Sequence, residues 1–236
     1  MKKILIASLL MSTSCAVQAM ADNVAAANTL SAPGWYFGMQ VGSASARPSM
    51  VQYDLGDTNP NGWTWNGRGK GSVSGVYLGS NLLTKDKVVM GVEADLGYAN
   101  LRDEGSELYA GVPDSEWLYG WKSGLQGSLR ARVGVMAGNA LFYVTGGIAM
   151  GRQTFNVYDD ASNTNFESHK NTMVGGTVGA GVEYALSTHV TARIEYRYTD
   201  FGKVSVTPNN DGYDGDYTDK HGVTQESLTV GVAYRF

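Results

Sequence analysis

Acidic and basic residues recur two positions apart along this chain, a spacing that could gather carboxylates and guanidinium groups into one site. Glu93 is two residues from Asp95, and Arg130 is two residues from Arg132. A carboxylate beside a cation can transfer protons when it faces a substrate. The same groups form structural ion pairs when they are buried, because each buried charge needs an opposite charge nearby. We interpret them as a structural ion-pair network that comprises Glu93, Asp95, Arg130, Arg132, Glu183, Arg193, Glu195 and Arg197.

The histidines give little support for nucleophilic catalysis. A Ser–His–acid site needs a histidine that contacts both a serine and an acid. His189 lies in a short turn, whereas His169 and His221 lie in or beside long loops. We therefore predict that the chain is not an enzyme.

The aspartates of the last loop are the remaining candidates for metal binding. Asp211, Asp214, Asp216 and Asp219 lack the spacing of a calcium loop. We interpret this run as a solvated acidic loop and predict neither a metal site nor a cofactor site.

The charged residues belong to segments in which apolar residues alternate with small or polar ones. The last segment, LTVGVAYRF (228–236), has two valines, a tyrosine and the terminal phenylalanine on one face. Alternation with a period of two residues predicts a strand with one apolar face. Turns and loops divide the chain into eight such segments. The predicted strands cover residues 34–44, 72–83, 88–99, 121–136, 141–152, 172–186, 190–199 and 228–236.

The connections between these strands alternate between short and long. The short turns are 84–87, 137–139 and 187–189, and the long loops are 47–70, 100–119, 153–170 and 200–222. In an antiparallel sheet, all four long loops then lie at the same end. This asymmetry is typical of a bacterial outer-membrane barrel, with short periplasmic turns and long extracellular loops. We predict an all-β fold, an eight-stranded antiparallel transmembrane β-barrel.

The distribution of charge indicates which face of each strand points outward. Glu93, Arg130 and the other network residues, together with Arg235, lie on the rows of small residues. A soluble barrel would bury the apolar rows and expose the charged ones. We predict the opposite arrangement, with apolar rows against lipid and four acids and five bases in the lumen. Aromatic residues support it because they gather at both ends of the apolar rows, as membrane interfaces require. They are Trp35, Phe37, Phe142, Tyr184, Tyr234 and Phe236 at the turn end, and Tyr98, Trp121 and Tyr198 at the loop end.

The amino terminus has the features of a cleaved secretory signal. Lys2 and Lys3 precede a short apolar run, and cleavage is expected after Ala21 or Ala19. We predict a signal peptide at 1–21, a linker at 22–33 and the barrel at 34–236. Cleavage after Ala21 leaves 18 − 2 = 16 basic against 22 acidic residues, which argues against nucleic acid as a partner.

Four segments resemble a known family. They are GVEADLGYA (91–99), YVTGGIAMG (143–151), GAGVEYALSTHVTARIEYRYTDFG (179–202) and VGVAYRF (230–236). They resemble the alphaproteobacterial small outer-membrane β-barrel proteins, which are OmpA-like and opacity-protein-like surface antigens and include hemin-binding members. The resemblance implies location in the outer membrane of a Gram-negative bacterium and contact with its lipid and lipopolysaccharide. It also implies insertion by the barrel-assembly machinery, with Tyr234 and Phe236 as the carboxyl-terminal assembly signal.

The resemblance implies roles in envelope integrity or host contact rather than one agreed activity. Our hypothesis is a structural, envelope-stabilising barrel that interacts with host or environmental partners through its extracellular loops. The alternatives are a narrow, porin-like ion channel and a surface receptor that binds hemin through His169, His221 or loop tyrosines. An eight-stranded barrel leaves an interior just wide enough for side chains, which disfavours a general porin.

Overall fold

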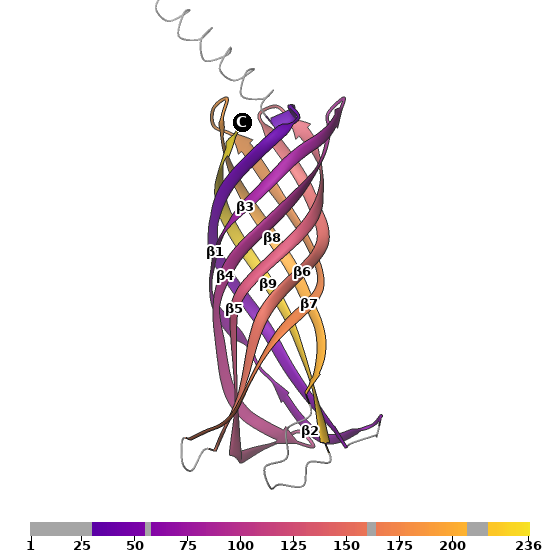
Figure 1. Cartoon of the computed structure of the whole chain (residues 1–236), viewed down its shortest axis with the longest axis vertical. Helices are drawn as coiled ribbons and strands as arrows, with labels where there is room; N and C mark the ends of the chain where they lie inside the picture. Colours follow the sequence, from indigo (N-terminus) through magenta and orange to yellow (C-terminus); the bar gives the residue numbers. More distant parts are fainter. Residues whose placement is uncertain (1–29, 55–57, 160–163, 207–216) are drawn as a thin grey trace, which may run out of the picture.

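The computed structural model describes residues 30–54, 58–159, 164–206 and 217–236, which form one antiparallel sheet. Figure 1 shows the strands winding steeply around a long barrel, with the carboxyl terminus at the end that carries the short turns. No helix among the described residues is long and apolar enough to cross a bilayer. The strands are β1 (Gly34–Asp54), β2 (Pro60–Asn66), β3 (Gly69–Lys85), β4 (Val88–Tyr109), β5 (Val112–Ala137), β6 (Ala140–Asp159), β7 (Thr164–Ala185), β8 (Val190–Val206) and β9 (Tyr217–Arg235).

The sheet closes because β1 pairs with β3 on one side and with β9 on the other. A walk along cross-strand partners from Phe37, through β3 and every strand to β9, returns to β1 at Arg47. The displacement is 47 − 37 = 10 residues, a stagger that tilts every strand relative to the barrel axis. Closure leaves no open edge around the wall, which a sheet in lipid requires.

The short strand β2 continues the line of β3 toward the loop end and does not add a ninth strand to the barrel wall. Gly69 of β3 pairs with Ala46, and Asn66 of β2 pairs with Ser49. The two pairs are therefore three positions apart both on β1 and on the segment that joins β2 to β3. The ladder is interrupted at Arg68, whose backbone N–H donates to the Asp103 carboxylate at 2.7 Å. The eight-stranded barrel predicted from the sequence is therefore confirmed, although the strands extend well beyond their predicted ends.

The four connections predicted as long loops consist of strand over much of their described length. The segment predicted as loop 100–119 continues β4 and β5, which meet at the two-residue turn Ala110–Gly111, where both φ angles are positive. Likewise β1 and β9 remain paired as far as Asp54 and Tyr217. Above the membrane neither face of a strand must be apolar, so the strand continues without the alternation that revealed it elsewhere. Asp211, Asp214 and Asp216 lie outside the described residues.

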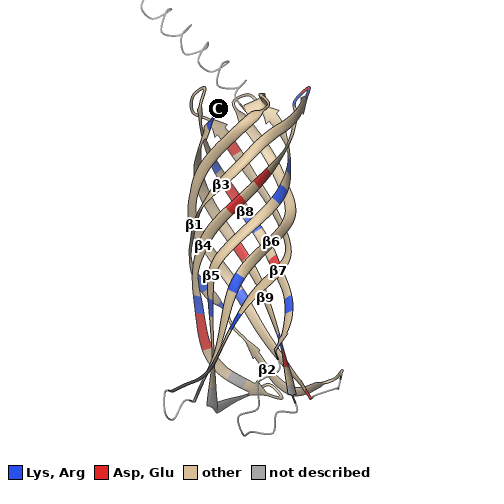
Figure 2. Ribbon diagram, in the orientation of Figure 1, with Lys and Arg blue, Asp and Glu red and all other residues tan. Residues whose placement is uncertain are grey.

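The apolar rows face outward, as predicted. Met39, Val144 and Val178 are 65%, 59% and 57% exposed, whereas Tyr36 and Glu93 are each 1% exposed. An outer surface covered by a continuous band of exposed apolar side chains is stable only against hydrocarbon. Tyr234 and Phe236 also face outward at the turn end, with their ring centroids 5.2 Å apart. In Figure 2, acidic and basic positions lie on neighbouring strands in the half of the barrel nearest the short turns, and further charged positions lie in the half nearer the loops.

One predicted interfacial aromatic residue lies inside instead. Trp121 is fully buried in the lumen, although Leu125, four residues further along β5, is 50% exposed. The pairing of β5 with β6 shifts between Ser123 and Gln126, which marks a β-bulge. An extra residue in one strand reverses the faces on either side of it. The sequence pattern does not reveal this bulge, so the predicted location of Trp121 was wrong.

Lumenal tyrosines lie flat over glycines on the neighbouring strand. Tyr36 pairs with Gly79, and a methyl group on Gly79 would come within 2.2 Å of the Tyr36 ring. Tyr77 covers Gly38 and Tyr143 covers Gly181 in the same manner. The glycines of the small-residue rows therefore create the space that these rings fill.

Replacement of Gly79 by alanine should displace the Tyr36 ring. We expect Gly79→Ala to lower the free energy of unfolding by about 1–3 kcal/mol, the usual range for overpacking. Denaturant unfolding of the refolded barrel, followed by circular dichroism, measures the change. Gly176→Ala is the control, because nothing lies within 4 Å of a methyl group at that position, and it should change stability by less than about 0.5 kcal/mol. Equal effects of the two substitutions would contradict this packing role.

Candidate functional site: the lumen

Glu93 is the centre of an ion-pair cluster that crosses the lumen. It extends from β4 and forms ion pairs with Arg130 of β5 and with Arg193 of β8, the latter at 2.6 Å. The Tyr36 hydroxyl of β1 donates to the same carboxylate at 3.0 Å. Four strands are therefore tied together through one side chain. Glu93 is 1% exposed, so these contacts replace its hydration entirely.

Arg130 connects Glu93 to a second buried carboxylate. Its Nη1 atom lies 2.8 Å from Glu195, which also accepts from Arg197 at 2.9 Å and from the Tyr143 hydroxyl at 2.9 Å. Arg197 in turn pairs with Asp95 at 3.2 Å. The chain of contacts thus runs without interruption from Glu93 to Asp95.

A second group of charges lies nearer the short turns. Glu183 forms an ion pair with Arg132, lies 3.5 Å from Arg235, and accepts from the Thr191 hydroxyl at 2.7 Å. The Arg132 guanidinium lies 4.0 Å from the centroid of the Tyr143 ring, a cation–π arrangement. This group is linked to the first because the Tyr36 hydroxyl accepts from Arg132 at 3.0 Å and donates to Glu93.

The structure places all eight residues of the sequence-derived network in this cluster, together with Arg235. Sequence reasoning did not include the three tyrosines that line it, although each lies on a small-residue row opposite a glycine. Every carboxylate of the cluster contacts at least one arginine, which supplies its counter-charge. The contacting tyrosines are Tyr36, Tyr77 and Tyr143.

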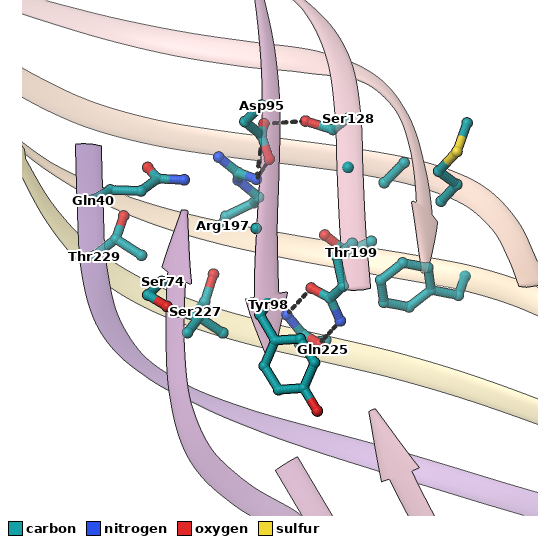
Figure 3. A pocket seen from close by; sticks show the side chains of 17 residues that line it. Gln40, Ser74, Asp95, Tyr98, Ser128, Arg197, Thr199, Gln225, Ser227 and Thr229 are labelled. Carbon is teal, nitrogen blue, oxygen red and sulfur yellow. Dashed lines mark hydrogen bonds and ion pairs between the residues drawn. The ribbon is translucent and has the colours of Figure 1, made fainter. Parts of the chain in front are cut away.

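A small polar cavity lies on the loop side of the ion pairs (Figure 3). Its volume is about 50 Å³, and its lining includes Gln40, Asp95 and Arg197. Gln126 and Gln225 face each other there through reciprocal hydrogen bonds of 2.8 and 3.1 Å. A cavity of this size and polarity suits a few water molecules. It is far smaller than the roughly 300 Å³ or more that an organic ligand requires.

An apolar cap closes the lumen beyond this cavity. Trp65 of β2, Trp121 of β5 and Phe155 of β6 are 2%, 0% and 3% exposed, and they pack with Phe201 of β8 into one cluster. Because Trp65 lies in β2, which continues β3 beyond Gly69, the interior is filled past the loop-end limit of β3. The cap is made of residues that the sequence analysis assigned to loops or to the membrane interface.

The opposite end of the lumen is occupied by the segment that precedes β1. Leu30 is fully buried among Val89, Leu141 and Ala185. The Asn81 side chain donates to the Leu30 carbonyl oxygen at 2.8 Å. The Thr84 hydroxyl donates to the carbonyl oxygen of Ser31 at 2.6 Å. The end of the predicted linker therefore acts as a stopper at the turn end of the barrel, a role that its small, polar composition did not suggest.

The loop-end histidines lie at the apolar cap. His221 is 3% exposed, and its ring centroid lies 4.2 Å from that of Phe155, which pairs with His169. Burial, and secondarily the neighbouring His169, lowers the pKa of His221 to about 4, so the ring is neutral at pH 7. Within the described part of the chain, no group of three or more His, Cys, Asp or Glu residues is placed to hold a metal ion.

A closed sheet with an apolar outer band and a charged, filled interior defines an outer-membrane β-barrel. Comparison with known proteins agrees. Residues 7–236 match the model of the outer membrane protein beta-barrel domain. The chain therefore belongs to this family, as the sequence resemblance predicted, and resides in the outer membrane of a Gram-negative bacterium.

Relatives with known names are similar over most of their length. The chain is 31% identical over 221 residues to the 31 kDa outer-membrane immunogenic protein of Brucella melitensis biotype 1. The matched region covers 92% of this chain and 88% of that protein. It is 33% identical over 184 residues to the 22 kDa outer membrane protein of Rhizobium leguminosarum bv. viciae, covering 78% and 73%. Among solved structures, OprG from Pseudomonas aeruginosa has the same fold, with a TM-score of 0.54 and 16% identity over 86% of this chain and 97% of that one.

Loss of the central arginine should destabilise the barrel strongly. Arg130→Ala leaves Glu93 and Glu195 short of a buried counter-charge, and we expect it to lower the free energy of unfolding by about 3–5 kcal/mol. The control is Arg47→Ala, which breaks a 3.5 Å pair with Glu226 on the exposed outer surface and should cost at most about 1 kcal/mol. Denaturant unfolding at pH 7 measures both, and similar losses for the two variants would contradict the role of the network.

The buried His221 should make the loop end sensitive to acid. Because its pKa falls from 6.5 in the unfolded chain to about 4 in the barrel, its contribution is complete above pH 6.5 and is lost as the pH falls toward 4. The full loss is about 3 kcal/mol. The hydrogen-exchange protection factors of residues 218–224, corrected for the intrinsic pH dependence of amide exchange, should therefore fall over this range. His221→Phe should remove most of that loss of protection, and an unchanged pH profile in this variant would show that another group is responsible.

Proposed function

We propose that this protein is a non-enzymatic structural barrel that stabilises the outer membrane and presents its extracellular strand extensions to the surroundings. The observation that carries the proposal is the filling of the lumen at three successive levels. These levels are the stopper around Leu30, the ion-pair cluster around Glu93 and the apolar cap around Trp121. A lumen closed in this way does not favour continuous passage of solutes.

The extracellular extensions are the part of the chain available for interactions. The strands β4 and β5 extend to a turn at Ala110–Gly111, about ten residues beyond Tyr98 and the end of the apolar band. The Brucella relative is named an immunogenic protein, and antibody recognition of a surface barrel requires exposed extracellular segments. We propose the same exposure for this chain, with host or environmental molecules as partners of these extensions.

Two further roles follow from the resemblance and remain proposals. The outward-facing Tyr234 and Phe236 at the end of β9 suit recognition by the barrel-assembly machinery. Hemin capture through loop histidines has less support, because the His221 ring packs against Phe155 and is almost fully buried. The porin-like alternative makes the clearest contrasting prediction, since it requires ion flow through the lumen.

Planar-bilayer conductance of the refolded mature protein tests the proposal. We expect no current steps from the native barrel, because three closures lie in series. We also expect Arg130→Ala/Arg132→Ala to remain silent, because the apolar cap around Trp121 and the stopper around Leu30 are still in place. Circular dichroism of each variant confirms that it has folded. Reproducible ion-selective steps from the native protein would contradict the proposal and favour the porin-like channel.

A further inference from the structure

Four cations occupy adjoining outward positions on one side of the barrel. Lys70 of β3 pairs with Arg102 of β4, and Arg102 pairs with Lys122 of β5. The same row continues through Thr154 of β6 to Lys170 of β7. Arg152 lies two residues from Thr154 on β6, and all five cationic side chains are exposed. These five residues, Lys70, Arg102, Lys122, Arg152 and Lys170, are called the cationic row below.

The five cations of the row are close together, and one exposed carboxylate, Glu104, lies two residues beyond Arg102 on β4. Side chains that pair across antiparallel strands lie about 4.5–5.5 Å apart at Cβ, and like charges in such positions repel each other. No ion pair between described residues of the chain involves a member of the row. On the other side of the barrel, by contrast, Arg47 pairs with Glu226, and the Lys220 ammonium lies 3.8 Å from the Tyr53 ring. With five cations beside one exposed carboxylate, the row keeps an excess of positive charge that an external anion would relieve.

The level of the row identifies the kind of anion. The outward apolar residues nearest to it on the same strands are Tyr98, Leu125, Met150 and Val174, which are 50–60% exposed. Each member of the row lies two to four residues beyond one of them, on the loop side, except that β3 has serines between Val76 and Lys70. The row therefore lies directly above the hydrocarbon band, where the headgroups of the outer leaflet lie. Figure 2 shows basic positions gathered again in the half of the barrel nearer the loops.

We propose that the cationic row binds the phosphate groups of an outer-leaflet glycolipid, the lipid A portion of lipopolysaccharide. The row faces sideways along the wall rather than outward along the barrel axis, so a lipid in the plane of the membrane reaches it directly. Its acyl chains would lie against Leu125, Met150 and Val174 while its phosphates contact Arg102, Lys122 and their neighbours. Arginine and lysine both form charge-assisted hydrogen bonds with phosphate oxygens. This inference deepens the proposed function, on which it rests, by naming the lipid that an envelope-stabilising barrel would hold.

Binding of lipid A to the refolded, detergent-solubilised barrel tests the proposal. The probes are diphosphorylated lipid A and the same lipid after enzymatic removal of its phosphates. We expect the native protein to bind the phosphorylated form about tenfold more tightly, with an affinity that falls as salt rises. The variant Arg102→Gln/Lys122→Gln should lose this preference, because two adjacent cations are removed from exposed positions.

The matched control removes two cations from the opposite end of the barrel. Lys85 and Lys87 flank the short turn between β3 and β4 and are also exposed, so Lys85→Gln/Lys87→Gln changes the net charge equally. It should leave the preference for phosphorylated lipid A unchanged. Equal affinity of the native protein for the two forms of lipid A, or an unchanged preference in Arg102→Gln/Lys122→Gln, would overturn the proposal.

Two further probes separate the lipid from other anions. Inorganic phosphate, or a soluble sulfated polysaccharide without acyl chains, should compete only weakly with lipid A. If the polysaccharide bound as tightly as lipid A, the row would be a receptor for soluble polyanions, and the lipid assignment would be wrong. The conductance experiment reports on the proposed function independently, since a conducting native barrel would contradict that function whatever the result with lipid A. A silent barrel that ignores lipid A phosphates would overturn only this inference.

Discussion

The requirement that every backbone group in lipid be hydrogen-bonded determines most of this structure. A sheet surrounded by hydrocarbon must close, and here β9 completes the ring by pairing with β1 from Tyr36 to Asp54. Eight strands with a stagger of ten residues form a narrow barrel. A narrow barrel in turn leaves an interior that only side chains can fill, so its contents must be packed and electrically matched. The filled lumen is therefore a consequence of closure with so few strands.

The lumen meets this demand by two devices that depend on each other. Glycines at Gly38, Gly79 and Gly181 let tyrosine rings lie against the wall, and the hydroxyl groups of Tyr36 and Tyr143 then reach carboxylates. Arginines supply the counter-charge and stack on the same rings, as Arg193 does over Tyr77 at 3.4 Å. Removing any one component would leave a buried charge or a void. The same contacts therefore stabilise the barrel and close its lumen. Interactions at the outer surface depend on other residues.

Parts of the site could be predicted because alternation is a local signal. Glu93, Arg130 and Glu195 lie on rows of small residues, so their inward direction follows from the period of two. Their particular partners do not follow, since Arg132 reaches Glu183 across the lumen rather than Glu93 on the adjacent strand. The apolar cap was not foreseen either. Trp65 belongs to a segment without alternation, and Trp121 follows a bulge that changes its face.

The number of strands, the outward direction of the apolar rows and the inward direction of the charges all follow from the amino-acid sequence. These features depend on residue type and spacing within single strands, because the row that faces lipid must be apolar and the row that faces the lumen must be small or charged. Only the tertiary structure decided the register, the bulge at Ser123–Gln126, the position of Leu30 inside the barrel and the alignment of Lys70, Arg102 and Lys122. Each of these depends on which residues of different strands become neighbours. The sequence pattern of one strand carries no information about that choice, because the stagger is set by the closed ring as a whole.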